Sequence, residues 1–286
     1  MTLLALGLVL LSAVLHASWN YFAKRASGDL IFLWLFCLVS AAVYAPLALA
    51  ILVWLRPTLG PTELGFLAGS TLLHFAYYVA LQHGYRVGDL SLVYPLARGS
   101  GPLLATVLAV VVLGERPSLL TLTGCATVVL AAVLLTGGPR LLGQLGNGRA
   151  VAFGLLTGGL IGLYTVWDKV IVGVLGIPPL LFTWLNDVGR TLLFTPTALR
   201  HWSRTGQTWR QFWREALAVG VLGPLSYLLV LWALVFSPVS TVAPAREVSI
   251  VIGAALGTRL LGEPAALRRL TAAGLMVLGV VALALG

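Results

Sequence analysis

The sequence predicts an all-α membrane protein with ten transmembrane helices, arranged as two inverted five-helix repeats around a central cavity. Three observations support this prediction. The 286 residues include only 18 basic and 9 acidic ones, whereas 59% are hydrophobic. The apolar runs are long and continuous, and they do not alternate with the period of a β-strand. Several landmarks of the first half return in the second half at a nearly constant spacing.

The composition excludes several classes of protein. Charged residues make up 9% of the chain, whereas a soluble domain carries about 25%. With a mean hydropathy of +0.99, the chain is neither an ordinary cytosolic enzyme, nor a secreted disulfide scaffold, nor a disordered protein. Cys37 and Cys125 lie in apolar runs without ligand spacing, so we expect no metal and no other cofactor. The lipid bilayer is therefore the expected partner of most of the surface.

Ten apolar runs approach the roughly 20 residues that a membrane-spanning helix needs. We expect residues 1–137 to form the first repeat, 138–150 a linker and 151–286 the second repeat. The first run lacks a basic leader and a cleavage site, so we expect it to be retained. Residues 200–214 are expected to form the one longer loop. The predicted spans are Leu3–Phe22, Leu30–Leu55, Glu63–Gln82, Leu90–Leu113, Ser118–Leu135, Val151–Val174, Pro179–Leu199, Ala216–Val235, Val239–Leu261 and Leu267–Leu285.

The basic residues predict an orientation. The net charge of +9 would suggest nucleic acid as the partner of a soluble protein, but here the bases lie in short loops between apolar runs, so we expect no nucleic acid. The loops on one side contain most of them, and the other side has only Arg56 and Arg116. By the positive-inside rule the basic side is cytoplasmic and both termini are outside. The basic side holds Lys24, Arg25, Arg86, Arg140, Arg149, Arg200, Arg204, Arg210, Arg214, Arg268 and Arg269.

The internal repeat is the strongest signal in the sequence. Residues 148 positions apart include Trp19 and Trp167, Arg98 and Arg246, and the Gly-Glu pairs that begin at Gly114 and Gly262; Tyr78 and Tyr227 are 149 apart. Each half has five spans, an odd number, so the second half must enter the membrane inverted. Inverted repeats are typical of transporters, whose binding site lies near the bilayer midplane between the repeats.

The same residues resemble a known family. The chain looks like the drug/metabolite transporter superfamily, and specifically its ten-span type with two EamA domains. The resemblance implies a carrier of small organic metabolites, often an exporter, with a cavity between the halves. It also implies cytoplasmic termini, opposite to the orientation that the loop charges predict. The residues that support it are Trp19-Asn20 with Lys24, Leu113-Gly114-Glu115-Arg116, Leu261-Gly262-Glu263, Gly124 and Gly274.

Two arginines lie at matching depths within predicted spans. Arg98 is about 13 Å into its span, near the midplane, and Arg246 occupies the equivalent place. A charge at the bilayer centre costs about 2.5–3.5 kcal/mol and needs a partner or a function. As functional groups, the two guanidiniums would hold a carboxylate or phosphate-like group. The alternative is structural pairing, of Arg246 with Glu247 and of Arg98 with carbonyls freed by Pro95 or Pro102.

Acidic residues within the spans are candidates for ion coupling or for ion pairs. Asp168 occupies the repeat position of Asn20 and could bind a substrate amine or a coupling proton; the alternative is an ion pair with a loop arginine. Its neighbour Lys169 must point to another side of the helix. Asp187 and Arg190 are three residues apart, so we expect them to pair along one helix face. Glu247 completes this set of candidates.

Aromatic and polar residues that share helix faces complete the predicted site. His16 with Trp19, Tyr164 with Trp167, and His74 with Tyr77 and Tyr78 have helical spacings. Such residues can line a cavity for an aromatic or amphipathic solute, or they can be interface belts and interhelical hydrogen-bonding groups. The predicted substrate-binding residues are Arg98, Arg246, Tyr94, Trp19, Asn20, Trp167, Tyr164, Tyr78, Tyr227, His16 and His74.

Together these observations predict a secondary transporter, an exporter or exchanger, that carries a small anionic or zwitterionic metabolite such as an amino acid or organic acid. It would work by alternating access as a monomer or homodimer in a bacterial-type plasma (inner) membrane. No P-loop occurs in the sequence, so a coupling proton or simple exchange is the expected driving force. We expect no catalytic residues. The alternatives are a membrane scaffold or sensor, and a lipid-modifying membrane enzyme.

Overall fold

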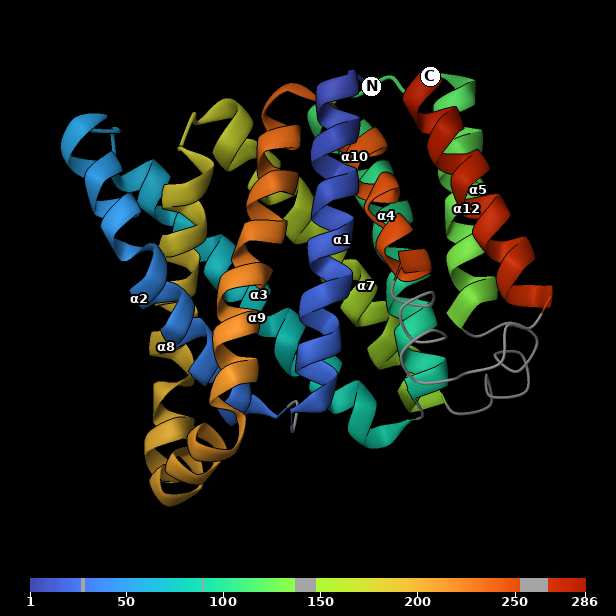
Figure 1. Ribbon diagram of the computed structural model, residues 1–286. Helices are drawn as coiled ribbons and strands as arrows, with labels where there is room; N and C mark the ends of the chain where they lie inside the picture. The colour runs from blue at the N-terminus through green and yellow to red at the C-terminus, as the bar shows by residue number, and fades with distance from the viewer. Residues whose placement is uncertain (27–28, 89, 137–147, 253–266) are drawn as a thin grey trace.

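The computed structural model describes residues 1–26, 29–88, 90–136, 148–252 and 267–286. Within this part of the chain it consists of ten α-helices and one π-helical turn, without strands. The helices run between two faces, and both termini lie at the same face (Figure 1). The elements are α1 (Leu3–Arg25), α2 (Leu30–Trp54), α3 (Pro61–Val87), α4 (Leu90–Leu113), α5 (Leu119–Thr136), α7 (Gly148–Lys169), η1 (Val170–Val174), α8 (Pro179–Arg200), α9 (Trp202–Phe236), α10 (Val239–Ala245) and α12 (Leu267–Leu285).

Six of the described helices are long and apolar enough, by length and composition, to cross a membrane. They are α1, α2, α3, α4, α9 and the continuous helix formed by α7 and η1. The apolar parts of α5 and α12 are shorter, and α8 has the length of a span but includes the polar residues Asn186, Asp187 and Arg190. The protein is therefore a multi-pass membrane protein, and α8 depends on neighbouring helices to cover its polar side chains.

Short local signals set the ends of several helices. The carboxylate of Asp29 accepts a hydrogen bond from the main-chain nitrogen of Phe32 at 2.9 Å and caps α2. Pro61 and Pro179 occupy the first turns of α3 and α8, where the missing N–H is not needed. Gly114 follows α4 with a φ of 68°, a left-handed conformation that glycine adopts without steric cost.

The segment predicted as a long loop, residues 200–214, is helical instead. The α9 helix begins at Trp202, and only Phe212, with φ −125° and ψ 25°, departs from helical geometry. The loop prediction was wrong because it relied on the four arginines of this segment. Thr205 and Thr208 are buried, so one face of the segment packs, while Trp202 and Trp209 border an apolar groove against α2 and the arginines remain exposed.

The predicted ninth span is not continuous. The α10 helix ends at Ala245, and Arg246 and Glu247 lie in a turn before a helical segment that begins at residue 248. Pro244 lies two residues before this turn, and its missing N–H removes a main-chain hydrogen bond from α10. Residues 253–261 of this span, linker residues 138–147 and the turn at Gly262-Glu263 lie outside the described residues.

Helices of the two halves pack mainly against each other. The α1 helix packs on α9, α2 on α8, α4 on α7 and α5 on α12. Small residues allow the closest approaches: a Cβ placed at Gly124 of α5 would lie 2.9 Å from the main-chain oxygen of Gly279 of α12. The two halves therefore form one bundle, and the space enclosed between them is shared.

Candidate functional site

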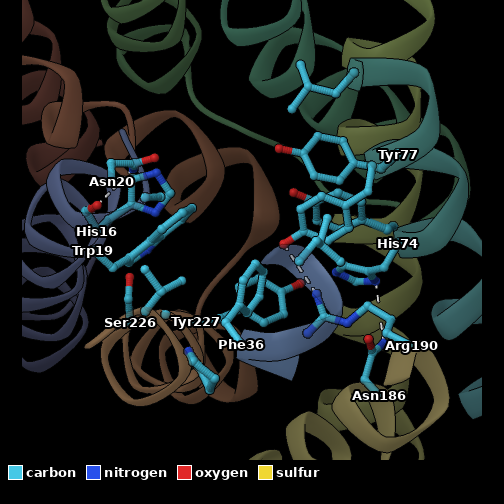
Figure 2. Close-up of a pocket in the computed structure, with 18 of the residues that line it drawn as sticks. His16, Trp19, Asn20, Phe36, His74, Tyr77, Asn186, Arg190, Ser226 and Tyr227 are labelled. Carbon is cyan, nitrogen blue, oxygen red and sulfur yellow. Dashed lines mark hydrogen bonds between the residues drawn. The ribbon is translucent and has the colours of Figure 1, made fainter. Parts of the chain in front are cut away.

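A cavity of about 280 Å³ lies between the halves. Its lining comes from helices α1, α2, α3, α4, α7, α8 and α9 and from Arg246, which follows α10. Figure 2 shows His16, Trp19 and Asn20 on one side and His74 and Tyr77 on the opposite side. The volume is close to the lower limit for small-molecule sites. The cavity is therefore suited to a small metabolite.

The cavity reaches one face of the molecule and is closed toward the other. Its lining extends to Ala23 and Asp29, which flank the turn between α1 and α2, at the face opposite the termini (Figure 1). Toward the terminal face, Ser12 of α1 and Ser226 of α9 each donate a hydrogen bond to the other's main-chain oxygen, at 2.8 and 3.0 Å. The open face is thus the one that carries the basic loop residues.

Three arginines line the cavity, and two of them are neutralised by carboxylates. The Nε atom of Arg98 lies 3.0 Å from Oε2 of Glu247, and Arg190 forms an ion pair with Asp187 one helical turn away. No carboxylate of the described residues lies within 4.0 Å of Arg246. Arg246 instead has its guanidinium carbon 5.4 Å from the ring centroid of Tyr227, so its charge is available to an anion.

Behind the cavity lining, Asp168 is fully buried within a polar cluster. Its carboxylate accepts hydrogen bonds from Ser70, at 2.6 Å, and from the Tyr227 hydroxyl, and His74 Nε2 lies 3.6 Å from Oδ2. Asn186 donates to Ser70 at 3.0 Å. Asp168 also lies two residues before a π-helical turn, a local distortion that is frequent at functional sites.

Aromatic rings form much of the cavity wall. The imidazole of His74 stacks on Tyr164 with ring centroids 4.2 Å apart, and Tyr227 meets both rings edge to face. Trp19 packs edge to face against His16 at 4.9 Å. Such a wall presents ring faces to apolar groups or rings of a solute.

Every predicted substrate-binding residue except Trp167 lines the cavity. Trp167 lies outside the lining, where its ring packs on Phe66 with centroids 4.7 Å apart and its Nε1 donates to the Phe66 main-chain oxygen at 2.8 Å. Asp168, Asp187 and Glu247 stand behind lining residues.

Two acidic residues, Glu247 and Asp168, have different partners from those expected for structural ion pairs. Glu247 pairs with Arg98 of α4, not with its neighbour Arg246. Asp168 contacts Ser70, Tyr227 and His74 rather than a loop arginine. Lys169 points away from Asp168 and donates to the main-chain oxygens of Leu234 and Ser237 at the end of α9, which neutralises a helix C-terminus.

Sequence reasoning missed Ser70 and Asn186, which connect α3 and α8 to Asp168. Helical spacing contained a signal for both. Ser70 is four residues before His74, and Asn186 is four residues before Arg190, so each shares a face with a recognised candidate. Small neutral polar residues are common in membrane helices, and for that reason neither was singled out.

Comparison with known families identifies the second half of the chain. Residues 148–285 match the model of the EamA-like transporter family. This half of the chain belongs to that family. The EamA-like half contributes α7, α8, α9 and Arg246 to the cavity. The protein is accordingly an EamA-family membrane transporter.

Comparison with curated proteins and with solved structures gives two further results. A search among curated proteins found no match. One solved crystal structure of a protein is similar over 98% of this chain and 96% of its own, with a TM-score of 0.77 and 15% identity. At this identity the similarity shows the fold alone. It extends over the first half as well, so the whole chain has the fold of a solved structure.

Proposed function

We propose that the protein is a secondary transporter, an exporter or exchanger, that carries a small anionic or zwitterionic metabolite through the cavity by alternating access. The observation that carries this proposal is the chemistry of the cavity lining. Arg246 offers a guanidinium without a carboxylate partner among the described residues. Aromatic rings from α1, α3, α7 and α9 surround the rest of the space.

This lining favours a solute with one acidic end and an apolar or aromatic body. A guanidinium binds a carboxylate or phosphate through two parallel hydrogen bonds, and the rings accommodate the body of the solute. Amino acids and organic acids of modest size fit both requirements and the volume of about 280 Å³.

The pattern of helix packing supports two inverted repeats as the moving parts. Exchanging the first five helices (α1 to α5) with the second five (α7, α8, α9, α10 and α12) converts the α1–α9 contact into the α7–α3 contact, and both are present. The contacts α2–α8, α4–α10 and α5–α12 are converted into themselves, and all three are present. Such a pseudo-twofold arrangement suits rocking of the repeats about a central site.

The loop charges favour a plasma membrane orientation with the open end of the cavity in the cytoplasm. Arg200, Arg204, Arg210 and Arg214 lie at or beyond the end of α8, on the open face. The positive-inside rule makes that face cytoplasmic. The proposed state is therefore inward-facing, ready to receive a cytoplasmic metabolite.

Counterflow in proteoliposomes tests the proposal. Vesicles loaded with phenylacetate, benzoate, L-phenylalanine or an aliphatic organic acid should accumulate the matching labelled compound transiently, whereas phenethylamine, which lacks a carboxylate, should not. Saturable counterflow with at least one carboxylate is the expected result. Absence of counterflow with every carboxylate of a broad amino-acid, organic-acid and phosphonate panel would contradict the proposal.

A further inference from the structure

Two charged groups at the cavity lack an opposite charge beside them. Among the described residues, Arg98 and Arg190 each have a carboxylate within 4.0 Å, whereas Arg246 has none. Asp168 likewise has no arginine or lysine within that distance, and only the imidazole of His74 comes near, at 3.6 Å. Because an unpaired buried charge is costly, each group needs a counterpart that arrives from outside: an anion for Arg246, and a proton for Asp168.

The surroundings of Asp168 select a proton rather than a substrate ammonium group. The carboxylate has no exposed surface and is absent from the cavity lining. Tyr227 and His74, which do line the cavity, stand against it. A proton is small enough to reach the carboxylate past His74 and Tyr227, whereas a bulkier amine would have to displace these side chains.

The groups around Asp168 come from three neighbouring helices and from α7 itself. The α3 helix contributes Ser70 and His74, and α9 contributes the Tyr227 hydroxyl. The α8 helix contributes Asn186 and the Asp187–Arg190 ion pair, and Tyr164 lies one turn earlier on α7 itself. The charges of Arg190 and Arg246 act on Asp168 from a greater distance, while Lys169 is directed to the end of α9.

Tyr227 links the two unpaired groups directly. Its hydroxyl donates a hydrogen bond to Asp168 Oδ2, and the Arg246 guanidinium lies 5.4 Å from the centre of its ring. An anion held by Arg246 would therefore be separated from the Asp168 carboxylate by little more than the Tyr227 side chain. In the low-dielectric interior, two negative groups at that separation repel each other strongly, and protonation of Asp168 removes the repulsion.

We propose that Asp168 binds a proton that is taken up together with the substrate anion, so that anion and proton cross the membrane in the same direction. The inference rests on the proposed transport function. The proton moves from water in the cavity to a carboxylate oxygen of Asp168, while the anion binds Arg246. A monoanion and one proton carry no net charge, so the step is electroneutral. An outward metabolite gradient would then export both, and an acidic exterior would favour uptake.

Thermodynamic linkage makes this inference measurable. If protonation of Asp168 favours anion binding, anion binding must favour protonation by the same factor. Isothermal titration of phenylacetate into the purified wild-type protein should show affinity that increases about a hundredfold between about pH 8 and about pH 5. At the pH where the affinity changes most steeply, repeating the titration in buffers of different ionisation enthalpy should show uptake approaching one proton per bound anion.

Variants locate the proton. Asp168→Asn imitates the protonated side chain, so it should bind phenylacetate with the acid-pH affinity at every pH and take up no proton. In vesicles it should retain counterflow but lose net accumulation driven by a pH gradient. Glu63→Gln is the matched control. It removes a carboxylate from the first turn of α3, the helix that also carries Ser70 and His74, and it should keep the wild-type pH dependence.

The outcomes separate this inference from the proposed function. If no carboxylate of the panel binds, the transport proposal itself is contradicted and the inference is contradicted with it. If phenylacetate or another carboxylate binds to the wild type without proton uptake, only the coupling inference is overturned; this measurement needs no variant and does not depend on folding of Asp168→Asn. A pH dependence that persists in Asp168→Asn and disappears in His74→Gln would assign the proton to His74 and overturn the role of Asp168.

Discussion

Arg98 and Arg246 are 148 residues apart in the sequence and have different partners in the structure. Glu247 lies against Arg98, at 3.0 Å, although it is the sequence neighbour of Arg246. The break after α10 lets adjacent residues point in different directions. As a result, Arg98 forms an ion pair that joins α4 to the second half of the chain, and Arg246 remains available in the cavity.

This difference predicts unequal effects of charge-conserving substitutions. Arg246→Lys should weaken binding of a transported carboxylate by about tenfold or more, because an ammonium cannot make the bidentate contact. Arg98→Lys retains a cation beside Glu247 and should change the affinity less. Titration calorimetry measures the affinity of both variants for the carboxylate, and thermal unfolding is the control for folding. A larger loss of affinity in Arg98→Lys would contradict the assignment of the two roles.

At the scale of single residues, the sequence indicated which side chains line the cavity better than which side chains contact one another. Helical spacing and the repeat pointed to His16, His74, Tyr164, Arg98 and Arg246, and these residues line one cavity. It could not predict which carboxylate meets which arginine, because that depends on how α4, α8 and the segment after α10 come together. Trp167 shares a face with Tyr164, but it lies one turn nearer the closed end, where it packs on Phe66.

The contact between α4 and α7 depends on residues without side chains. A Cβ placed at Gly162 of α7 would lie 2.9 Å from the main-chain nitrogen of Ala105 of α4. Backbone atoms cannot rotate away, so the helices would have to separate. Gly159, on the same helix, has nothing within 4 Å of the equivalent position.

Gly162→Ala and Gly159→Ala therefore form a matched pair. We expect Gly162→Ala to destabilise the fold by about 1–3 kcal/mol, because overpacking forces backbone shifts. Gly159→Ala should be neutral or slightly stabilising, since alanine is the better helix former by about 1 kcal/mol. Thermal unfolding in detergent compares them. Equal melting temperatures for the two variants would show that the α4–α7 contact is looser than described.

Helix boundaries were predicted well where hydropathy alone decides them and poorly where packing does. The runs from Leu30 and Leu90 begin helices where expected. The helical segment from Trp202 was missed because it is only partly covered: Thr205 and Thr208 are buried, whereas Trp202, Trp209 and the arginines are exposed. The break at Arg246 could be expected from Pro244, yet α4 passes through Pro95 and Pro102 without interruption. Neighbouring helices decide which prolines end a helix.

At the scale of the whole molecule, the two faces differ in charge. The face opposite the termini carries the arginines between α8 and the break in α9, and the terminal face carries Arg56 after α2 and Arg116 after α4. The cavity reaches the first face. Orientation in the membrane therefore decides from which compartment this conformation loads its substrate.

Cysteine labelling in intact cells tests the orientation. With Arg210→Cys, a membrane-impermeant maleimide should react only after the cells are opened, whereas with Arg56→Cys it should react in intact cells. The native thiols of Cys37 and Cys125 are buried and should contribute little background. Reversed labelling would place the termini in the cytoplasm, and the cavity would then open to the outside.

Alternating access requires that the closed face opens during each cycle. Ser12 and Ser226 meet on that side of the cavity with their Oγ atoms 3.1 Å apart. Cysteines at these two positions are close enough to form a disulfide, subject to its preferred geometry. Such a cross-link would join α1 to α9, helices of opposite halves, and hold the closed side shut while leaving the other entrance free.

Counterflow by the Ser12→Cys/Ser226→Cys variant is the most direct test of transport through this cavity. Under oxidising conditions the cross-linked protein should still bind a transported carboxylate but give no counterflow, and a reductant should restore the flux. Each single-cysteine variant should be insensitive to oxidation. Undiminished counterflow by fully cross-linked protein would contradict the account, because the solute would then cross without opening of the α1–α9 contact.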